Sequence, residues 1–117
     1  TVHYNASITP GWKDKKRAAD CARDADALVI GTFQWADSPA WSQINAVREL
    51  LKLKKPTVLI SMMSPYDILH YKDAPAMLVT YGANKYSMSA AGKILSGELP
   101  PSGELPFKLE ETRATSP

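Results

Sequence analysis

Three short apolar runs separated by helical patterns constrain the fold of this 117-residue chain more than any other feature. The runs cover residues 27–33, 57–62 and 77–81, and none of them alternates polar with apolar side chains. Continuous runs of β-branched and aliphatic residues are typical of strands that are covered on both faces. The runs therefore predict the strands of a buried, mostly parallel sheet.

Helical patterns lie before, between and after these runs. Thr9-Pro10 is a favourable N-cap and first helical position, which predicts a helix from there to about Arg23. Ser38-Pro39 gives the same signal for a second helix. The residues expected to face the core from these two helices are Ala18, Cys21, Ala22, Ala25, Ile44, Val47, Leu50 and Leu51. A third helix, over about residues 87–96, would turn Met88, Ala91 and Leu95 inward.

The order of helices and strands predicts an α/β fold, a three-layer α/β/α sandwich with a mostly parallel sheet and flavodoxin-like connections. Residues 1–111 are predicted to form one domain, with residues 2–8 as a candidate for a further strand, and residues 112–117 to form a disordered tail. Three or four strands are few for such a sheet. We therefore expect either an incomplete domain or a sheet edge that pairs with a second copy of the chain.

Composition excludes several classes of function. The formal net charge of +2 predicts neither nucleic-acid binding nor attraction to a membrane surface, and no apolar run is long enough for a membrane span. Cys21 is the single cysteine, so an internal disulfide is impossible, and the spacing of the two histidines matches no metal site. Phosphate-binding glycine loops are absent. We expect no cofactor and no metal, and the sequence leaves the cellular compartment open.

Polar and aromatic side chains follow each predicted strand. Because ligands and partners of parallel sheets meet the carboxyl ends of the strands, these loops are the predicted site. Aromatic rings and amides suit a sugar, although the same rings could cap the core or anchor a neighbouring domain. The candidate residues for a substrate or a domain interface are Gln34, Trp35, Trp41, Ser64, Tyr66, Asp67 and Tyr81.

Two alternatives bear on the acidic residues of these loops. Residues 64–67 also fit a simple helix start, with Ser64 as N-cap, Pro65 at the first position and Asp67 in the first turn. Glycoside hydrolysis needs two groups flanking the bond, and no pair of loop carboxylates has a spacing that marks such a pair. Those carboxylates are Asp37, Asp67, Asp73, Glu98 and Glu104.

Five segments, in order, resemble the C-terminal α/β domain of family 3 glycoside hydrolases, which include β-N-acetylhexosaminidases and β-glucosidases. They are residues 25–32 (ADALVIGT), 55–61 (KPTVLIS), 64–67 (SPYD), 78–82 (LVTYG) and 94–106 (ILSGELPPSGELP). The last combines two glycines with the adjacent Pro100 and Pro101 in a constrained turn after a helix. The SPYD and TYG segments favour the hexosaminidase branch.

The resemblance implies a part of a glycoside hydrolase rather than a whole one. In the family, the catalytic groups belong to an N-terminal barrel, and no segment here matches them, so we expect this chain alone to be inactive. It would pack on the barrel of the same parent protein and shape the cleft for the parent's carbohydrate substrate. The alternatives are a free-standing carbohydrate-binding module and a self-associating structural domain.

Overall fold

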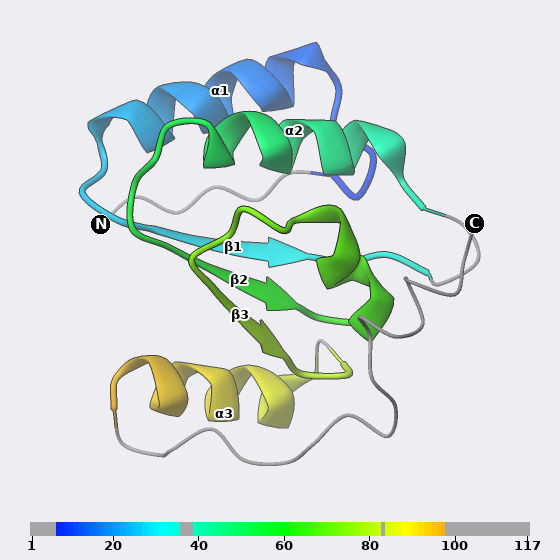
Figure 1. Cartoon of the computed structure of the whole chain (residues 1–117). Coiled ribbons are helices and arrows are strands. Elements are labelled where there is room, and N and C mark those ends of the chain that lie inside the picture. The colour runs from blue at the N-terminus through cyan, green and yellow to red at the C-terminus, as the bar shows by residue number, and fades with distance from the viewer. Residues whose placement is uncertain (1–6, 36–38, 83, 98–117) are drawn as a thin grey trace.

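The computed structural model describes residues 7–35, 39–82 and 84–97. The elements, in chain order, are α1 (Trp12–Asp24), β1 (Leu28–Thr32), α2 (Trp41–Leu51), β2 (Thr57–Ser61), the 3₁₀-helix η1 (Pro65–His70), β3 (Ala76–Val79) and α3 (Lys85–Leu95). Helices α1 and α2 lie on one face of the sheet, and α3 lies on the other (Figure 1). The predicted α/β fold is therefore confirmed.

The sheet is parallel throughout, with strand order β1-β2-β3. Ile30 of β1 lies beside Leu59 of β2, which lies beside Met77 of β3. Neighbours in a parallel register point to the same face. All three strands therefore end at one edge, where the three predicted loops begin.

The main core lies between the sheet and α2. It is a cluster of buried residues from α2, β2 and the segment after η1, namely Ile44, Val47, Leu59 and Tyr71. Ile30, Leu51 and Ala74 pack against this cluster. On the other face, Ile60 and Ala91 are buried, and they belong to β2 and α3. Of the residues predicted to face the core from α1, only Ala22 is buried, and Cys21 is half-buried.

The prediction that all three strands are covered on both faces was wrong for both edge strands: β3 begins with two exposed residues, and β1 is uncovered along one face. The residues of β1 alternate between covered and exposed positions, and Val29 is 62% exposed. The reason is the place of β1 in the sheet. β1 lies at the edge farthest from α3, which runs beside β3 (Figure 1). Only the face turned toward α1 and α2 is therefore covered by a helix of the described part of the chain.

The predicted helix starts were also wrong by a few residues. Helix α1 begins after Gly11, because Thr9 takes part in a turn in which its N–H donates to the Ser7 hydroxyl at 3.0 Å. Helix α3 begins after Asn84, whose side chain accepts the Ser87 N–H at 2.9 Å. Of the residues predicted to face inward from α3, Ala91 is buried and Met88 is half-buried, whereas Leu95 is 42% exposed.

The N-cap of α2 is Ala40, so the predicted start at Ser38-Pro39 was wrong as well. Gly97 closes α3 in the left-handed conformation, with φ at 83°, as expected for a glycine after a helix. The rest of the constrained turn, the tail and most of the candidate N-terminal strand lie outside the described residues. No helix in the described ranges is long and apolar enough to cross a membrane.

This packing predicts unequal costs for two strand substitutions. Leu59→Ala, at a site only 1% exposed, should lower the free energy of unfolding by about 2–5 kcal/mol, because it leaves a cavity in the core. Val29→Thr keeps the branched shape at an exposed site and should change it by less than about 0.5 kcal/mol. Urea unfolding monitored by circular dichroism measures both. A large loss with Val29→Thr would contradict the exposed face of β1.

Candidate functional site

The structure brings three of the predicted site residues together in a buried polar cluster at the carboxyl ends of the strands. Gln34, Ser64 and Asp67 are 3%, 7% and 3% exposed. Gln34 follows β1, whereas Ser64 and Asp67 belong to the connection after β2. Sequence reasoning placed these residues in neighbouring loops, and the parallel sheet puts the loops side by side.

Asp67 is the centre of this cluster. Its Oδ2 accepts a hydrogen bond from the Thr32 hydroxyl at the end of β1, and its Oδ1 accepts one from Gln34 Nε2 at 2.6 Å. Gln34 Nε2 also lies 3.3 Å from the Tyr71 hydroxyl, and Gln34 Oε1 accepts the Ala40 N–H at 2.8 Å. The carboxylate therefore ties η1 to β1 and to the segment that precedes α2.

Ser64 is the N-cap of η1, as predicted by the interpretation of residues 64–67 as a helix start. Its hydroxyl accepts the Tyr66 N–H at 3.3 Å, and Pro65 occupies the first helical position. The Ser61 hydroxyl, at the end of β2, donates to the Ser64 carbonyl at 2.8 Å. Every buried side-chain nitrogen and oxygen in the described part of the chain has a hydrogen-bond partner. The cluster is thus internally satisfied and does not present an open row of donors or acceptors.

Burial controls the electrostatics of the cluster. Desolvation raises the pKa of the Asp67 carboxyl above its usual 3.8, and this effect outweighs the Thr32 and Gln34 hydrogen bonds and the His70 charge, which lower it. Burial likewise raises the pKa of the Tyr71 hydroxyl, and the nearby Asp67 charge adds to that rise. Asp67 is therefore a positioning residue, because its oxygens are used to hold other parts of the chain.

The aromatic members of the predicted site lie outside this cluster. Trp35, Trp41, Tyr66 and Tyr81 are 58%, 54%, 36% and 52% exposed. Trp35 makes an edge-to-face contact with Phe33, with ring centres 5.7 Å apart. The seven predicted residues therefore divide into a buried polar group and an exposed aromatic group at the same edge of the sheet.

Residues that sequence reasoning missed hold the aromatic group in place. Gln43 of α2 accepts the Phe33 N–H at 2.9 Å and donates to the Phe33 carbonyl at 3.1 Å, which fixes the chain just before Gln34 and Trp35. The ring of Trp41 packs edge-on against His70, with centres 5.4 Å apart. A polar residue on the apolar stripe of α2 was the available signal for Gln43. No local sequence pattern indicated that Trp41 would pack against His70.

The described residues include only part of the acidic side chains of these loops. Of the five loop carboxylates singled out above, Asp67 and Asp73 fall in the described ranges, whereas Asp37, Glu98 and Glu104 lie outside them. Asp67 is buried with its oxygens bonded, and Asp73 is exposed. The described residues contain no group of His, Cys, Asp and Glu side chains that could hold a metal ion. The geometry suits positioning and contact.

One solved structure has this fold within a larger enzyme. A glycoside hydrolase family 3 β-N-acetylglucosaminidase from Paenibacillus sp. str. FPU-7 matches 91% of this chain with a TM-score of 0.82 and 18% sequence identity. The chain spans only 20% of the length of that enzyme. No family model and no curated protein matches the chain. The likeness confirms the fold that the sequence resemblance implied.

The raised pKa of the Asp67 carboxyl predicts how the free energy of unfolding changes with pH. A carboxyl whose pKa is higher in the folded chain contributes stability that is fully present below the unfolded pKa and is lost as pH rises through the folded pKa. The free energy of unfolding of the wild type relative to Asp67→Asn should therefore fall as pH rises above about 3.8. Urea unfolding across this pH range measures it. A difference that grows with pH would contradict the burial of Asp67.

The cluster also predicts that removal of the Asp67 carboxylate lowers the free energy of unfolding by a large amount. Asp67→Ala leaves the Thr32 hydroxyl and the Gln34 amide buried without that partner, which should lower the free energy of unfolding by about 2–4 kcal/mol. The matched control is Asp73→Ala, at an exposed carboxylate, with an expected change below about 0.5 kcal/mol. Equal effects of the two substitutions, measured by thermal and urea unfolding, would show that Asp67 does not organise the cluster.

Proposed function

We propose that this chain is the C-terminal α/β domain of a β-N-acetylhexosaminidase-like member of glycoside hydrolase family 3. In this role it packs on the catalytic barrel of the same parent protein and shapes one wall of the substrate cleft. It hydrolyses no glycosidic bond alone. The observation that supports the proposal most is the match of 91% of this chain to 20% of such an enzyme.

The distribution of side chains at the carboxyl edge of the sheet supports a contact role. The polar residues there are buried and bonded to one another, so their chemistry is used within the domain. The residues that remain on the surface are large aromatics, Trp35 and Trp41 among them. Aromatic side chains of this kind are the usual anchors of interfaces, where their burial contributes most of the binding energy.

The same exposed rings favour a second candidate, a free-standing carbohydrate-binding module. Indole rings can stack on the apolar C–H face of a sugar, and Trp41 is held by its contact with His70. This module would bind N-acetylglucosamine without a barrel. The two candidates therefore differ in what the isolated chain does with the sugar.

Two measurements on the 117-residue chain separate the candidates. We expect no turnover of nitrophenyl N-acetylglucosaminide and no saturable heat of binding with N-acetylglucosamine, because the barrel would supply the reacting groups and most of the cleft. Clear turnover would refute the accessory role. Saturable binding that Trp41→Ala abolishes and Leu95→Ala preserves would instead support the binding module.

A third measurement tests the contact with a barrel directly. The proposal expects the DNA upstream of the Thr1 codon to encode an eight-fold β/α pattern, which can be produced as a separate domain. Trp41→Ala should weaken the association of the chain with that domain about tenfold or more, as expected of an aromatic anchor. Leu95→Ala, at the far end of α3 and 42% exposed, is the control and should have little effect. An upstream sequence without a barrel would refute the proposal.

A further inference from the structure

Within the described residues, β1 has a free edge on the side away from β2. The Leu28 N–H donates to the Pro56 carbonyl at 2.8 Å, so Leu28 bonds the β2 side. Alternate residues of a parallel strand bond the same neighbour. Val29 and Gly31 therefore direct their N–H and C=O groups away from β2. Such a row of backbone donors and acceptors pairs readily with a further strand.

The sequence of β1 does not oppose such pairing. Exposed edge strands are usually protected by charged side chains, by proline or by a bulge. β1 has the sequence LVIGT, which contains neither a charge nor a proline, and its register with β2 runs without a bulge from Leu28 to Thr32. The edge therefore carries none of the features that keep another strand away.

The handedness of the connections determines on which side of β1 a preceding strand lies. Helix α2 connects β1 to β2, and α1 lies on the same face of the sheet as α2 (Figure 1). Crossovers between parallel strands are right-handed in nearly all proteins. A parallel strand that leads into α1 must therefore lie on the opposite side of β1 from β2. That position is the free edge.

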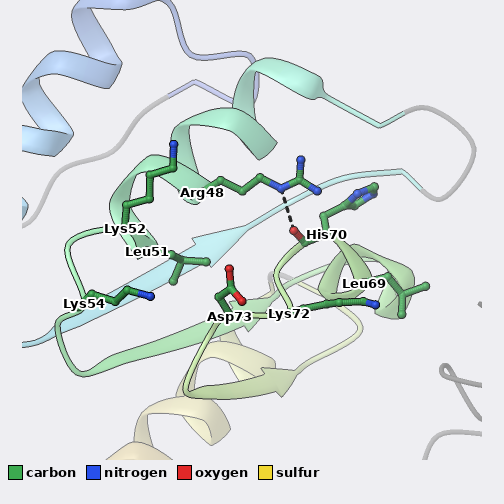
Figure 2. Close-up of a pocket in the computed structure, with 8 residues that line it drawn as sticks. All are labelled: Arg48, Leu51, Lys52, Lys54, Leu69, His70, Lys72 and Asp73. Carbon is green, nitrogen blue, oxygen red and sulfur yellow. Dashed lines mark hydrogen bonds between the residues drawn. The ribbon is translucent and has the colours of Figure 1, made fainter.

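The chain that enters α1 is held where such a strand would end. Gln43 Nε2 donates to the Ile8 carbonyl at 2.8 Å and to the Phe33 carbonyl at 3.1 Å, and Phe33 directly follows β1. One buried side chain thus binds residue 8 beside the carboxyl end of β1. Helix α2, which carries Gln43, is itself held, because Arg48 Nε donates to the His70 carbonyl at 3.0 Å (Figure 2).

We propose that residues 1–6, which lie outside the described ranges, pair with β1 as a parallel strand and occupy its free edge. A strand rises about 3.3 Å per residue, so this segment spans about 20 Å, enough for the five residues of β1. Its sequence is TVHYNA, in which threonine, valine and tyrosine favour strands and neither glycine nor proline occurs. The candidate strand at residues 2–8 is thereby narrowed, because Ile8 lies in a bend before α1.

Two other occupants compete for this edge, a second copy of the chain and residues 98–117. Because α3 lies on the opposite face of the sheet from α2, the right-handed rule directs a strand after α3 toward the same side of the sheet. The Gln43 bond to Ile8 favours residues 1–6, since it holds the chain that follows them beside β1. Closure by residues 1–6 would remove this edge from self-association, and it does not depend on the function proposed above.

The test is NMR spectroscopy of the isotope-labelled 117-residue chain. We expect nuclear Overhauser effects between the backbones of residues 2–6 and residues 28–32. The Val29 and Gly31 amides should exchange with solvent at least about tenfold more slowly than in an unstructured chain, because the added strand bonds them. The Ile30 amide, which bonds β2, is the internal control for a folded sheet.

Two proline variants probe the pairing itself. Adjacent residues of a strand direct their N–H groups to opposite sides, so only one of His3 and Tyr4 bonds β1. One of His3→Pro and Tyr4→Pro should therefore speed the exchange of Val29 and Gly31 by about tenfold or more, whereas the other should be tolerated, as proline is at an outer edge. Ile30 should stay protected in both variants.

Four results would overturn the proposal. The first is rapid exchange of Val29 and Gly31 in the wild-type chain, and the second is the absence of any effect of either proline. The third is a set of nuclear Overhauser effects that joins β1 to residues 98–117 in place of residues 2–6. The fourth is protection that appears only as the protein concentration rises, together with a dimer in light scattering, which would identify a second copy as the occupant.

Discussion

The buried carboxylate of Asp67 is the constraint on which the rest of the carboxyl edge depends. Hydrogen bonds from Thr32 and Gln34 join it to residues 35 and 33 positions earlier in the chain. These bonds hold η1 against the end of β1, and η1 in turn carries Tyr66 and His70. Desolvation makes the ionised carboxylate costly, as its raised pKa shows. The donors around it offset part of that cost, so the arrangement depends on the whole cluster being intact.

The position of η1 at this edge also determines which segment of the chain lies beside α2. The chain leaves η1 at Tyr71, whose ring is 1% exposed and packs with Ile44 and Leu59. It then returns to β3 without another helix, so the flank of α2 faces a loop. The exposed Met77 on β3 is a consequence of the same thin cover. The short connection thus accounts for both the core contact of Tyr71 and the loop beside α2.

The sequence predicted the features that depend on local pattern. The continuous apolar run at residues 57–62 became β2, the central and most buried strand, because a central strand has neighbours on both sides. The apolar run that forms β1 gave the same prediction of a strand covered on both faces. β1 lies at an edge of the sheet, however, because its position depends on strand order. Asp67 looked like a residue favoured by a helix dipole. Its burial and its bonds to Thr32 and Gln34 are long-range, so no local pattern could show them.

The separation of buried amides from exposed aromatic rings bears on what the carboxyl edge can do. Gln34 and Gln43 are buried, and their side chains bond the backbone at Phe33, before Trp35, and at Ala40, before Trp41. Each indole therefore follows backbone that hydrogen bonds within the domain hold in place. Ordering a surface in advance reduces the entropy lost when a partner binds, so it favours tight contact over loose association.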